Sequence, residues 1–257
     1  MSTDGSPAPA GARYRTWVRL HRLRALAGAT VVSLAGCVLA FVSPWFLFFL
    51  VPLGIFGYIT LILALTVYRL GPRGGDFQRR IHLLIAGSVS LENGGRALDV
   101  GCGSGSLAVK VAQAHPGASV TGVDSWGHDW EYSKDQCDRN ARAEGVAGRV
   151  SFEQQSGSAL SFADGSFDAV VSCMTFHEIK ENADRFDGVV EALRVLRPGG
   201  AFVFLDLFGD PAFYPNPAGI RTVETPRPLA EVMDLPFPLR HPKVLGHAML
   251  LTGTKPA

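Results

Sequence analysis

The feature that most constrains this chain is one long uncharged stretch. Residues 25–68 contain no Asp, Glu, Lys, Arg or His, in a chain of 257 residues that carries 24 basic and 23 acidic side chains. One membrane crossing takes roughly 20 apolar residues, so this stretch is too long for one span and long enough for two. Proline cannot continue a helix, and the Ser-Pro step at residues 43–44 is therefore the expected break. The sequence predicts two transmembrane helices, at about residues 25–42 and 45–68.

The positive charges predict how this hairpin is oriented. Arginines flank both of its outer ends, whereas the turn between the helices carries no charge. Positively charged residues favour the cytoplasmic side of a membrane, so both outer ends are expected inside the cell. The sequence therefore predicts a multi-pass protein of the cell (plasma) membrane whose N-terminus and soluble part are cytoplasmic. The arginines are Arg13, Arg15, Arg19, Arg22 and Arg24 before the first helix and Arg69, Arg73, Arg79 and Arg80 after the second.

The same stretch has two other interpretations. A secretory signal peptide has an apolar region of about 7–15 residues and an A-x-A-like cleavage site, whereas this stretch is far longer and ends in no such site. The second alternative is a helical hairpin buried in the core of a soluble protein. In the membrane interpretation, the chain consists of a disordered basic segment (1–24), the transmembrane hairpin (25–70), a linker with an amphipathic helix (71–94) and a soluble domain (95–257).

Composition excludes some classes of function. A net charge of +1 provides no bulk attraction to nucleic acid, so no nucleic-acid partner is expected. The four cysteines show no C-x-x-C spacing, and neither a disulfide framework nor a zinc site is indicated. No metal site is predicted.

Strand and helix patterns alternate along the soluble part. This alternation predicts an α/β domain with an open, doubly wound and mostly parallel sheet. Ligands bind such sheets beyond the carboxyl ends of the strands. The predicted strands are residues 96–100, 119–123, 150–153, 167–172 and 201–207, with a closing strand at 244–252; the predicted helices are 107–114, 132–144 and 182–196.

A glycine-rich loop follows the first of these strands. Residues 98–105 read LDVGCGSG, so glycines at alternate positions let the backbone turn tightly and approach a ligand. A nicotinamide-binding loop would read G-x-G-x-x-G and would hold a pyrophosphate. Here Asp99 stands two residues before Gly101, and its carboxylate would repel a pyrophosphate. A cationic ligand that carries an ammonium group suits this loop better.

This loop resembles the nucleotide-binding motif of class I S-adenosylmethionine-dependent methyltransferases. Three further segments are similar to motifs of that family and occur in the family's order: 121–124 (TGVD), 160–168 (LSFADGSFD) and 196–200 (LRPGG). The resemblance covers about residues 95–207. It implies a Rossmann-like methyltransferase fold, S-adenosyl-L-methionine as the cofactor and methyl transfer as the reaction.

The resemblance also implies roles for single residues. Gly101, Gly103 and Gly105 would shape the cofactor loop, Asp99 would lie near the methionine end, and Asp124 would bind the ribose. Many members have an acid on the adenine after strand three, where this chain has Gln155-Ser156-Gly157-Ser158. The remaining candidate cofactor-binding residues are Cys102 within the loop, Ser125 and Trp126 beside the adenine, Ser156 and Gly157 after strand three, and Ser172 at the end of strand four.

The segment after strand four carries the candidate catalytic groups. His177 has an ordinary pKa suited to a general base, and Glu178 would orient it or stabilise its charge. The alternative is that both side chains merely cap the next helix or hold the loop. Trp126, Trp130 and Tyr132 form either a wall of the pocket or ordinary packing.

Together these features predict a membrane-anchored methyltransferase. Because tethering confines an enzyme to a surface, a small acceptor that is hydrophobic, lipid-like or membrane-associated is expected. One alternative is a membrane module that binds S-adenosylmethionine without catalysing transfer, which the missing acid after strand three would favour. A nicotinamide-dependent oxidoreductase is disfavoured by the glycine spacing and by Asp99.

Overall fold

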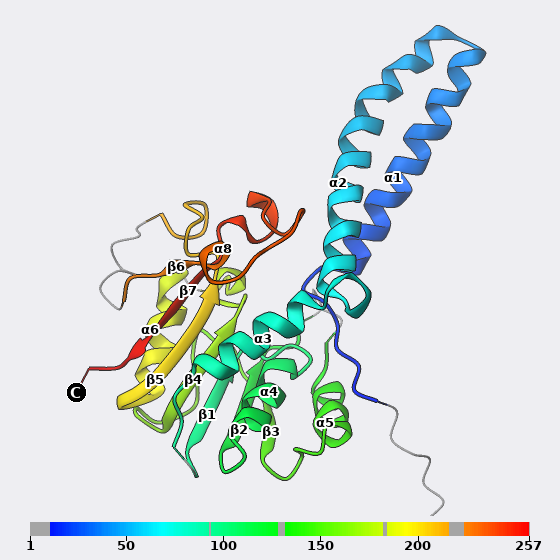
Figure 1. Ribbon diagram of the computed structural model, residues 1–257. Helices are drawn as coiled ribbons and strands as arrows, with labels where there is room; N and C mark the ends of the chain where they lie inside the picture. The colour runs from blue at the N-terminus through cyan, green and yellow to red at the C-terminus, as the bar shows by residue number, and fades with distance from the viewer. Residues whose placement is uncertain (1–10, 93, 128–131, 182–183, 216–223, 257) are drawn as a thin grey trace, which may run out of the picture. The chain divides into compact units, whose positions relative to one another are not determined.

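The computed structural model describes residues 11–92, 94–127, 132–181, 184–215 and 224–256. The chain divides into two units (Figure 1). The first unit holds Thr16–Gln78 and Leu235–Val244, and the second holds Met1–Arg15, Arg79–Asp234 and Leu245–Ala257. Trp130 and the first ten residues of the predicted disordered segment lie outside the described residues.

The first unit is built on a pair of antiparallel helices (Figure 1). The Oγ1 atoms of Thr30 and Thr60 lie 3.1 Å apart across the pair. A Cβ on Gly36 would lie 2.4 Å from the ring of Phe49, so the absence of a side chain at this position allows close packing. The elements are α1 (Leu20–Val38), two 3-10 turns (Leu39–Phe41 and Pro44–Phe49) and α2 (Leu50–Leu70).

Two stretches of this hairpin are long and apolar enough to cross a membrane, by length and composition: Leu20–Phe41 and Pro44–Leu70. Only 11% and 6% of their most apolar windows are buried, whereas a core helix of a soluble protein is mostly buried. The predicted break at residues 43–44 is where the second 3-10 turn begins. The first helix begins at Leu20, earlier than the predicted residue 25, because the arginines near its start are good helix formers.

The second unit contains the predicted α/β sheet. Its strand order is β3-β2-β1-β4-β5-β7-β6, and β1 to β5 are parallel, whereas β7 runs antiparallel to both β5 and β6. The mostly parallel sheet is therefore confirmed. The strands are β1 (Arg96–Val100), β2 (Ser119–Asp124), β3 (Val150–Gln154), β4 (Phe167–Cys173), β5 (Leu196–Asp206), β6 (Arg227–Pro228) and β7 (Met249–Thr254).

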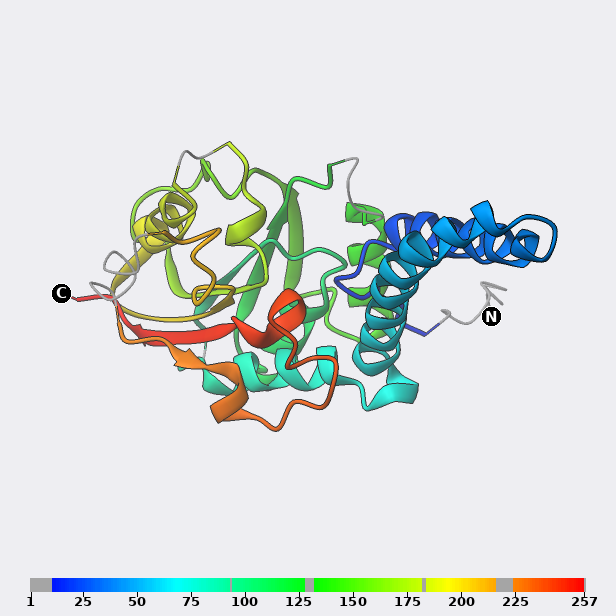
Figure 2. The same ribbon diagram turned by 90° about the horizontal axis from the view of Figure 1, so that it is seen from above.

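Helices cover both faces of the sheet, and α3 and α6 lie on opposite sides of it (Figure 2). The core beside α6 is formed by buried residues such as Leu98, Val170 and Phe204 from the strands and Val189 from the helix. The helices are α3 (Phe77–Ser88), α4 (Ser106–Ala114), α5 (Lys134–Ala143), α6 (Phe186–Val195) and α8 (Leu229–Val232).

Two strand boundaries differ from the predictions. β5 begins at Leu196 rather than at 201, because Leu196 pairs with Phe167 and an irregularity in the register follows before Ala201. The Arg-Pro-Gly-Gly sequence thus forms a bulged strand entry instead of a turn. The closing strand begins at Met249 rather than at 244, because Pro242–Gly246 forms a π-helical turn.

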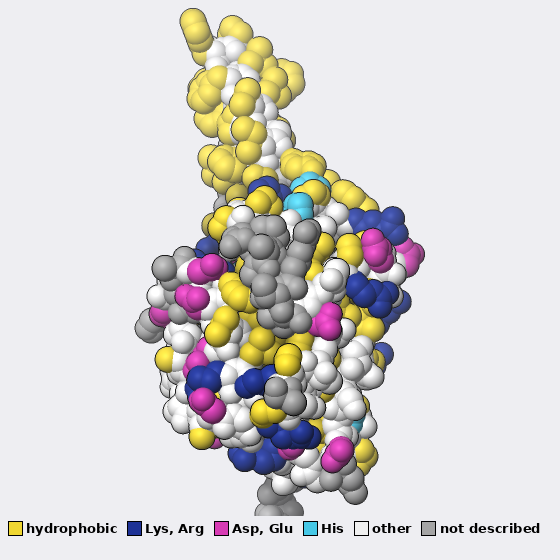
Figure 3. All heavy atoms as spheres, turned by 90° about the vertical axis from the view of Figure 1, so that its left-hand side faces the viewer, with side chains coloured by type: hydrophobic (Ala, Val, Ile, Leu, Met, Phe, Trp, Pro, Cys, Tyr) yellow, Lys and Arg dark blue, Asp and Glu magenta, His cyan; other side chains and the backbone are white. Residues whose placement is uncertain are grey.

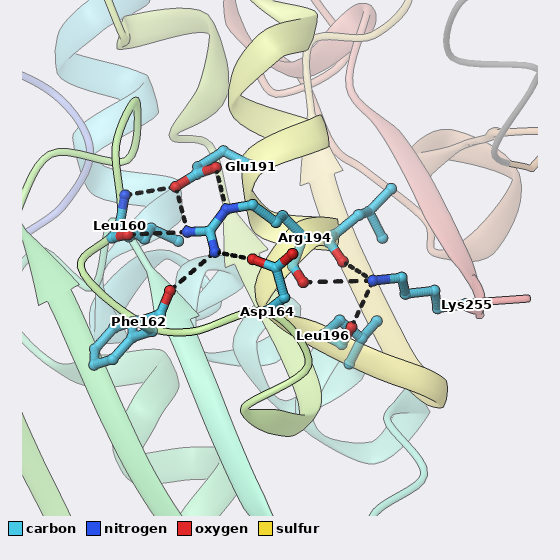
Figure 4. A network of polar contacts seen from close by, with 8 residues as sticks. Leu160, Phe162, Asp164, Glu191, Arg194, Leu196 and Lys255 are labelled. Carbon is cyan, nitrogen blue, oxygen red and sulfur yellow. Dashed lines mark hydrogen bonds and ion pairs between the residues drawn. The ribbon is translucent and has the colours of Figure 1, made fainter. Parts of the chain in front are cut away.

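One arginine ties the segment before β4 to α6 (Figure 4). The Arg194 guanidinium donates to both carboxylate oxygens of Glu191 and to Asp164, at 2.6–2.8 Å. It also donates to the carbonyls of Leu160 and Phe162, both at 2.9 Å. A planar guanidinium can serve several acceptors at once, so this side chain organises the segment that leads into β4.

We expect Arg194→Lys to lower the free energy of unfolding by about 1–2 kcal/mol, because an ammonium cannot serve these acceptors together and the site is partly exposed. Chemical denaturation of the full-length protein measures this change. Arg139→Lys is the matched control, because Arg139 is an exposed arginine on α5. Equal stability of the two variants would contradict the role given to Arg194.

Candidate active site

The glycine loop connects β1 to α4 and adopts a conformation that side chains disfavour. Gly101, Gly103 and Gly105 have φ angles of 75°, 56° and 79°. A Cβ on Gly101 would lie 2.1 Å from Oγ1 of Thr175, and one on Gly105 would lie 2.8 Å from the ring of Phe152. Both the backbone conformation and the packing therefore require glycine at these two positions.

Asp124, at the end of β2, holds this loop in place. Its carboxylate accepts hydrogen bonds from the backbone N–H of Gly103 at 2.9 Å and of Trp126 at 2.8 Å. The Trp126 indole N–H in turn donates to the Gly103 carbonyl at 2.9 Å. Burial raises the pKa of Asp124, and the N–H groups of Trp126, Gly103 and Ser125 oppose this shift. The predicted ribose acid and its neighbouring tryptophan thus also support the glycine loop.

Asp99 is a buried carboxyl group in β1. Its side chain is 1% exposed, and neither oxygen forms a hydrogen bond with the described residues. Burial raises the pKa of Asp99 to about 8; the nearby Ala108 N–H opposes this shift and the charge of Asp124 adds to it. Two acids whose pKa values are raised together favour a positively charged ligand, which would stabilise both of their ionised forms.

The other predicted cofactor residues occupy different surroundings. The buried Ser172 hydroxyl donates to the Val100 carbonyl at 2.9 Å and so joins β4 to β1. The Ser156 hydroxyl lies 2.8 Å from that of Ser158, and it also accepts from the Ser158 N–H. Ser125 is exposed at the carboxyl end of β2. Ser156 and Ser172 thus already have partners within the chain.

The two remaining positions, Cys102 and Gly157, lie in packed surroundings. Cys102 is buried, and burial raises the pKa of its thiol. The thiol therefore behaves as a packing group rather than as a nucleophile. A Cβ on Gly157 would lie 2.9 Å from Ile179 and 3.2 Å from Val100. Gly157 is thereby placed next to the end of β1 and the segment that follows β4.

That segment after β4 carries a histidine–aspartate pair. The Nδ1 atom of His177, in a 3-10 turn (Phe176–Glu178), lies 2.7 Å from Oδ1 of Asp206 at the end of β5. The His177 side chain is 10% exposed and that of Asp206 is fully buried. Because Asp206 accepts the Nδ1 proton, Nε2 is the ring nitrogen that acts as a proton acceptor when the imidazole is neutral. Glu178 contributes an oxygen 3.8 Å from Nε2.

Asp206 also positions the turn that carries His177. Its Oδ2 accepts the backbone N–H groups of Thr175 at 3.0 Å and Phe176 at 2.7 Å, and its Oδ1 accepts that of Leu207 at 2.7 Å. Thr175 Oγ1 in turn lies 3.4 Å from the Gly101 carbonyl. The histidine and the glycine loop are thus neighbours. Asp206 lies within the strand predicted at residues 201–207, and no local sequence pattern pairs it with His177.

Two aromatic side chains, Phe213 and Tyr132, lie beside different parts of the site. The Phe213 ring lies 5.2 Å from that of His177, centroid to centroid. A Cβ on Gly103 would lie 3.4 Å from the Tyr132 ring, so this aromatic side chain faces the glycine loop. Trp130 is outside the described residues, and the three-residue aromatic cluster predicted after β2 therefore remains a prediction.

These residues fit S-adenosyl-L-methionine. The unpaired Asp99 carboxylate, buried against the glycine loop, suits a ligand with an ammonium group and a positively charged sulfur. The glycine backbone leaves the approach to the strand ends free of side chains. Among the described residues, no group of three or more His, Cys, Asp or Glu side chains is arranged to hold a metal ion.

Known proteins share this part of the chain. Residues 98–204 match the family described as "Methyltransferase domain". The chain is 35% identical to 27-O-demethylrifamycin SV methyltransferase of Amycolatopsis mediterranei, over 53% of this chain and 46% of that protein. It is also 35% identical to the ubiquinone/menaquinone biosynthesis C-methyltransferase UbiE of Geotalea daltonii, over 46% of this chain and 48% of that one. The chain thus spans about half the length of the curated relatives it matches.

A solved structure supports the same fold. A geranyl diphosphate methyltransferase in complex with S-adenosylmethionine aligns with a TM-score of 0.57, at 16% identity, over 73% of this chain and 89% of that one. Together the family match and the relatives confirm the predicted methyltransferase domain at residues 98–204 and S-adenosyl-L-methionine as its cofactor, and the solved structure confirms the Rossmann-like fold. They favour this interpretation over a nicotinamide-dependent oxidoreductase.

The raised pKa of Asp99 predicts a pH-dependent stability. Below pH ~4 the Asp99 carboxyl is protonated in both the folded and the unfolded state. Between pH ~4 and the folded-state pKa of about 8, only the unfolded state loses this proton. The free energy of unfolding therefore falls as the pH rises through this range. We expect Asp99→Asn to remove this loss. The melting temperature of the variant, without ligand, should therefore exceed that of the wild type by more at pH 8 than at pH 5.

Asp135→Asn is the control for this measurement, because Asp135 is an exposed acid in the first turn of α5. It should show no such pH-dependent gain. A difference between Asp99→Asn and wild type that is the same at both pH values would contradict the buried, unpaired state of Asp99.

Proposed function

We propose, from the methyltransferase domain at residues 98–204, that the whole chain transfers a methyl group from S-adenosyl-L-methionine to a small acceptor that is hydrophobic or membrane-associated. The observation that carries this proposal is the His177–Asp206 pair beside the glycine loop. This arrangement puts a proton acceptor, His177, next to the glycine loop, where the cationic methyl donor would bind.

When bound, the donor would supply a methyl group whose bond to a positively charged sulfur breaks, so that the sulfur departs as a neutral thioether. Nε2 of His177 takes the proton that the acceptor's hydroxyl or acidic carbon loses as it bonds to the methyl carbon. The Asp206 carboxylate, 2.7 Å from Nδ1, stabilises the imidazolium that results and keeps the ring oriented. Asp99 would provide the counter-charge for the donor's ammonium group, and Asp124 holds the glycine loop through the Gly103 N–H.

Two features support a small, hydrophobic acceptor. The relatives named above are, by their names, methyltransferases of rifamycin and of quinone biosynthesis, and they include an O- and a C-methyltransferase. The exposed apolar hairpin would hold the domain at a membrane, where hydrophobic acceptors are concentrated. Nucleic acid is not a proposed partner.

The hairpin is the proposed membrane anchor. A buried core hairpin is disfavoured because most of both apolar windows is exposed. A signal sequence would account for the helix near the N-terminus but not for the second one. The arginines at both outer ends support a cytoplasmic N-terminus and a catalytic domain on the cytoplasmic face of the cell membrane. In this proposal residues 25–70 are the anchor, 71–94 the linker and 95–257 the catalytic domain.

A membrane module that binds the donor without transferring its methyl group is the second candidate. The observation that favours it is Ser156, which stands where many family members have an acid and which bonds to Ser158. Calorimetric binding of S-adenosylmethionine without turnover of any acceptor in a membrane extract would support this candidate over the enzyme.

We expect His177→Gln to lower methyl transfer by about 10²-fold or more, the scale of a lost general base, while binding of S-adenosylmethionine is retained. Asp206→Asn should lower transfer as well, because an amide neither stabilises the imidazolium nor accepts all four N–H groups. Transfer rates and calorimetric donor binding, measured side by side, test this expectation. His247→Gln is the control histidine; an equal loss in all three variants would contradict the assignment.

We expect labelled methyl donor, incubated with the full-length protein and membranes, to place its label in the organic-solvent extract. The physical reason is that the anchored domain meets acceptors dissolved in the bilayer at a raised local concentration. Mass spectrometry of the extract identifies the compound that gains a methyl group. Label found only in protein or RNA would overturn the proposed acceptor class.

A further inference from the structure

The glycine loop is supported from outside by a buried amide on α5. Asn140 is 3% exposed, and its Nδ2 atom donates a hydrogen bond to the Ser104 carbonyl of the loop at 2.9 Å. Three residues earlier on the same helix face, the Cys137 thiol donates to the Gly103 carbonyl at 3.2 Å. Because glycines leave a backbone free to change conformation, groups outside the loop must hold its shape. Asn140 and Cys137 are two such groups.

The same amide binds the chain segment that precedes α1. The Arg13 backbone N–H donates to Oδ1 of Asn140 at 2.8 Å, and Nδ2 of Asn140 donates to the Arg13 carbonyl at 3.0 Å. Nε2 of Gln136 donates to the same carbonyl at 2.9 Å, and the Tyr14 hydroxyl donates to Glu144 at 3.3 Å. Both N–H groups and the oxygen of the Asn140 amide are thus in use. This one side chain joins the N-terminal segment to the glycine loop.

A second contact joins the loop to the segment that follows the hairpin. Nδ1 of His82, on α3, lies 2.9 Å from the Ser106 hydroxyl, and both side chains are buried. Ser106 is the first residue of α4, directly after the loop. Arg13 precedes α1 and His82 follows α2, and between them the hairpin exposes large apolar side chains (Figure 3). Segments on both sides of the hairpin therefore bond to the glycine loop or to its end, and all of these contacts lie within the second unit.

We propose that Asn140 is a positioning residue for S-adenosyl-L-methionine, and that binding of Arg13 to its amide strengthens donor binding at the glycine loop. A loop that is already held in shape loses less conformational freedom when a ligand binds, so the ligand binds more tightly. By thermodynamic linkage, donor binding must in turn strengthen the attachment of the N-terminal segment. This proposal rests on the donor site used in the proposed function, but not on its acceptor or its membrane anchor.

A pair of substitutions at position 13 separates the backbone contact from the side chain. Arg13→Pro removes the N–H that donates to Asn140, because proline has no backbone N–H, whereas Arg13→Ala keeps it. In calorimetric titration of the full-length protein with S-adenosylmethionine, the dissociation constant should be about 3- to 10-fold higher for Arg13→Pro than for Arg13→Ala, the scale of one lost hydrogen bond. Asn140→Asp should weaken donor binding by at least as much, because a carboxylate donates no hydrogen bond to the Ser104 carbonyl.

Hydrogen exchange of residues 11–15 supplies a measurement that a loss of stability alone would not change. In the wild type, S-adenosylmethionine should slow exchange in this segment, and the effect should be absent in Asn140→Asp. Val195→Ala is the control for stability, because Val195 is a buried residue at the end of α6, next to the amino end of β5. The glycine loop lies at the opposite, carboxyl edge of the parallel strands. This variant should have a lower melting temperature but an unchanged dissociation constant for the donor.

The outcomes separate this proposal from the proposed function. If the wild type binds the donor but the two position-13 variants bind it equally well, the role of the N-terminal segment is wrong and the proposed function stands. The same conclusion follows if the donor leaves exchange of residues 11–15 unchanged, or if Val195→Ala weakens donor binding as much as Arg13→Pro does. If the wild type itself binds no donor, both proposals fail. Because the position-13 variants leave the folded core intact, they decide the question even if Asn140→Asp does not fold.

Discussion

The arrangement of the candidate active site depends on the buried carboxylate of Asp206. One side chain accepts N–H groups from His177, Thr175, Phe176 and Leu207, all at 2.7–3.0 Å. A buried carboxylate without such donors would be costly, whereas four donors satisfy it and hold the turn after β4 against the end of β5. The same interaction orients the imidazole and brings its turn next to the glycine loop. The hydrogen bonds that hold the turn after β4 in place are therefore the same ones that orient the proposed general base.

The two acids beside the glycine loop, Asp99 and Asp124, are less fully hydrogen-bonded than Asp206. Asp99 is buried, and its oxygens form no hydrogen bond with the residues that the structure describes, whereas the oxygens of the nearby Asp124 accept hydrogen bonds from the loop backbone. A protein that retains an unpaired buried acid gives up stability, and such groups gather at functional sites. A cationic ligand would supply the missing partner. This explains in physical terms why the loop suits a donor with an ammonium group better than a pyrophosphate.

Much of the fold could be predicted because its signals are local. The strands from β1 to β4 begin within a residue of their predicted positions, because short apolar runs and glycine or proline stops lie close together in the chain. The boundaries of β5 and β7 were misjudged. The Arg-Pro-Gly-Gly sequence has the composition of a turn, yet pairing of Leu196 with Phe167 extends the strand through it. Pairing partners are distant in sequence and overrode local preference there.

The sequence by itself determined the uncharged hairpin, the glycine loop and the order of the four motifs, since each depends on residues that are neighbours in the chain. Only the tertiary structure decided that Asp206 is the partner of His177 and that residues 235–244 join the hairpin at Tyr58. Both contacts link segments that no local pattern connects. They form because strand register and side-chain packing bring distant residues together, and a single sequence carries no direct record of that packing.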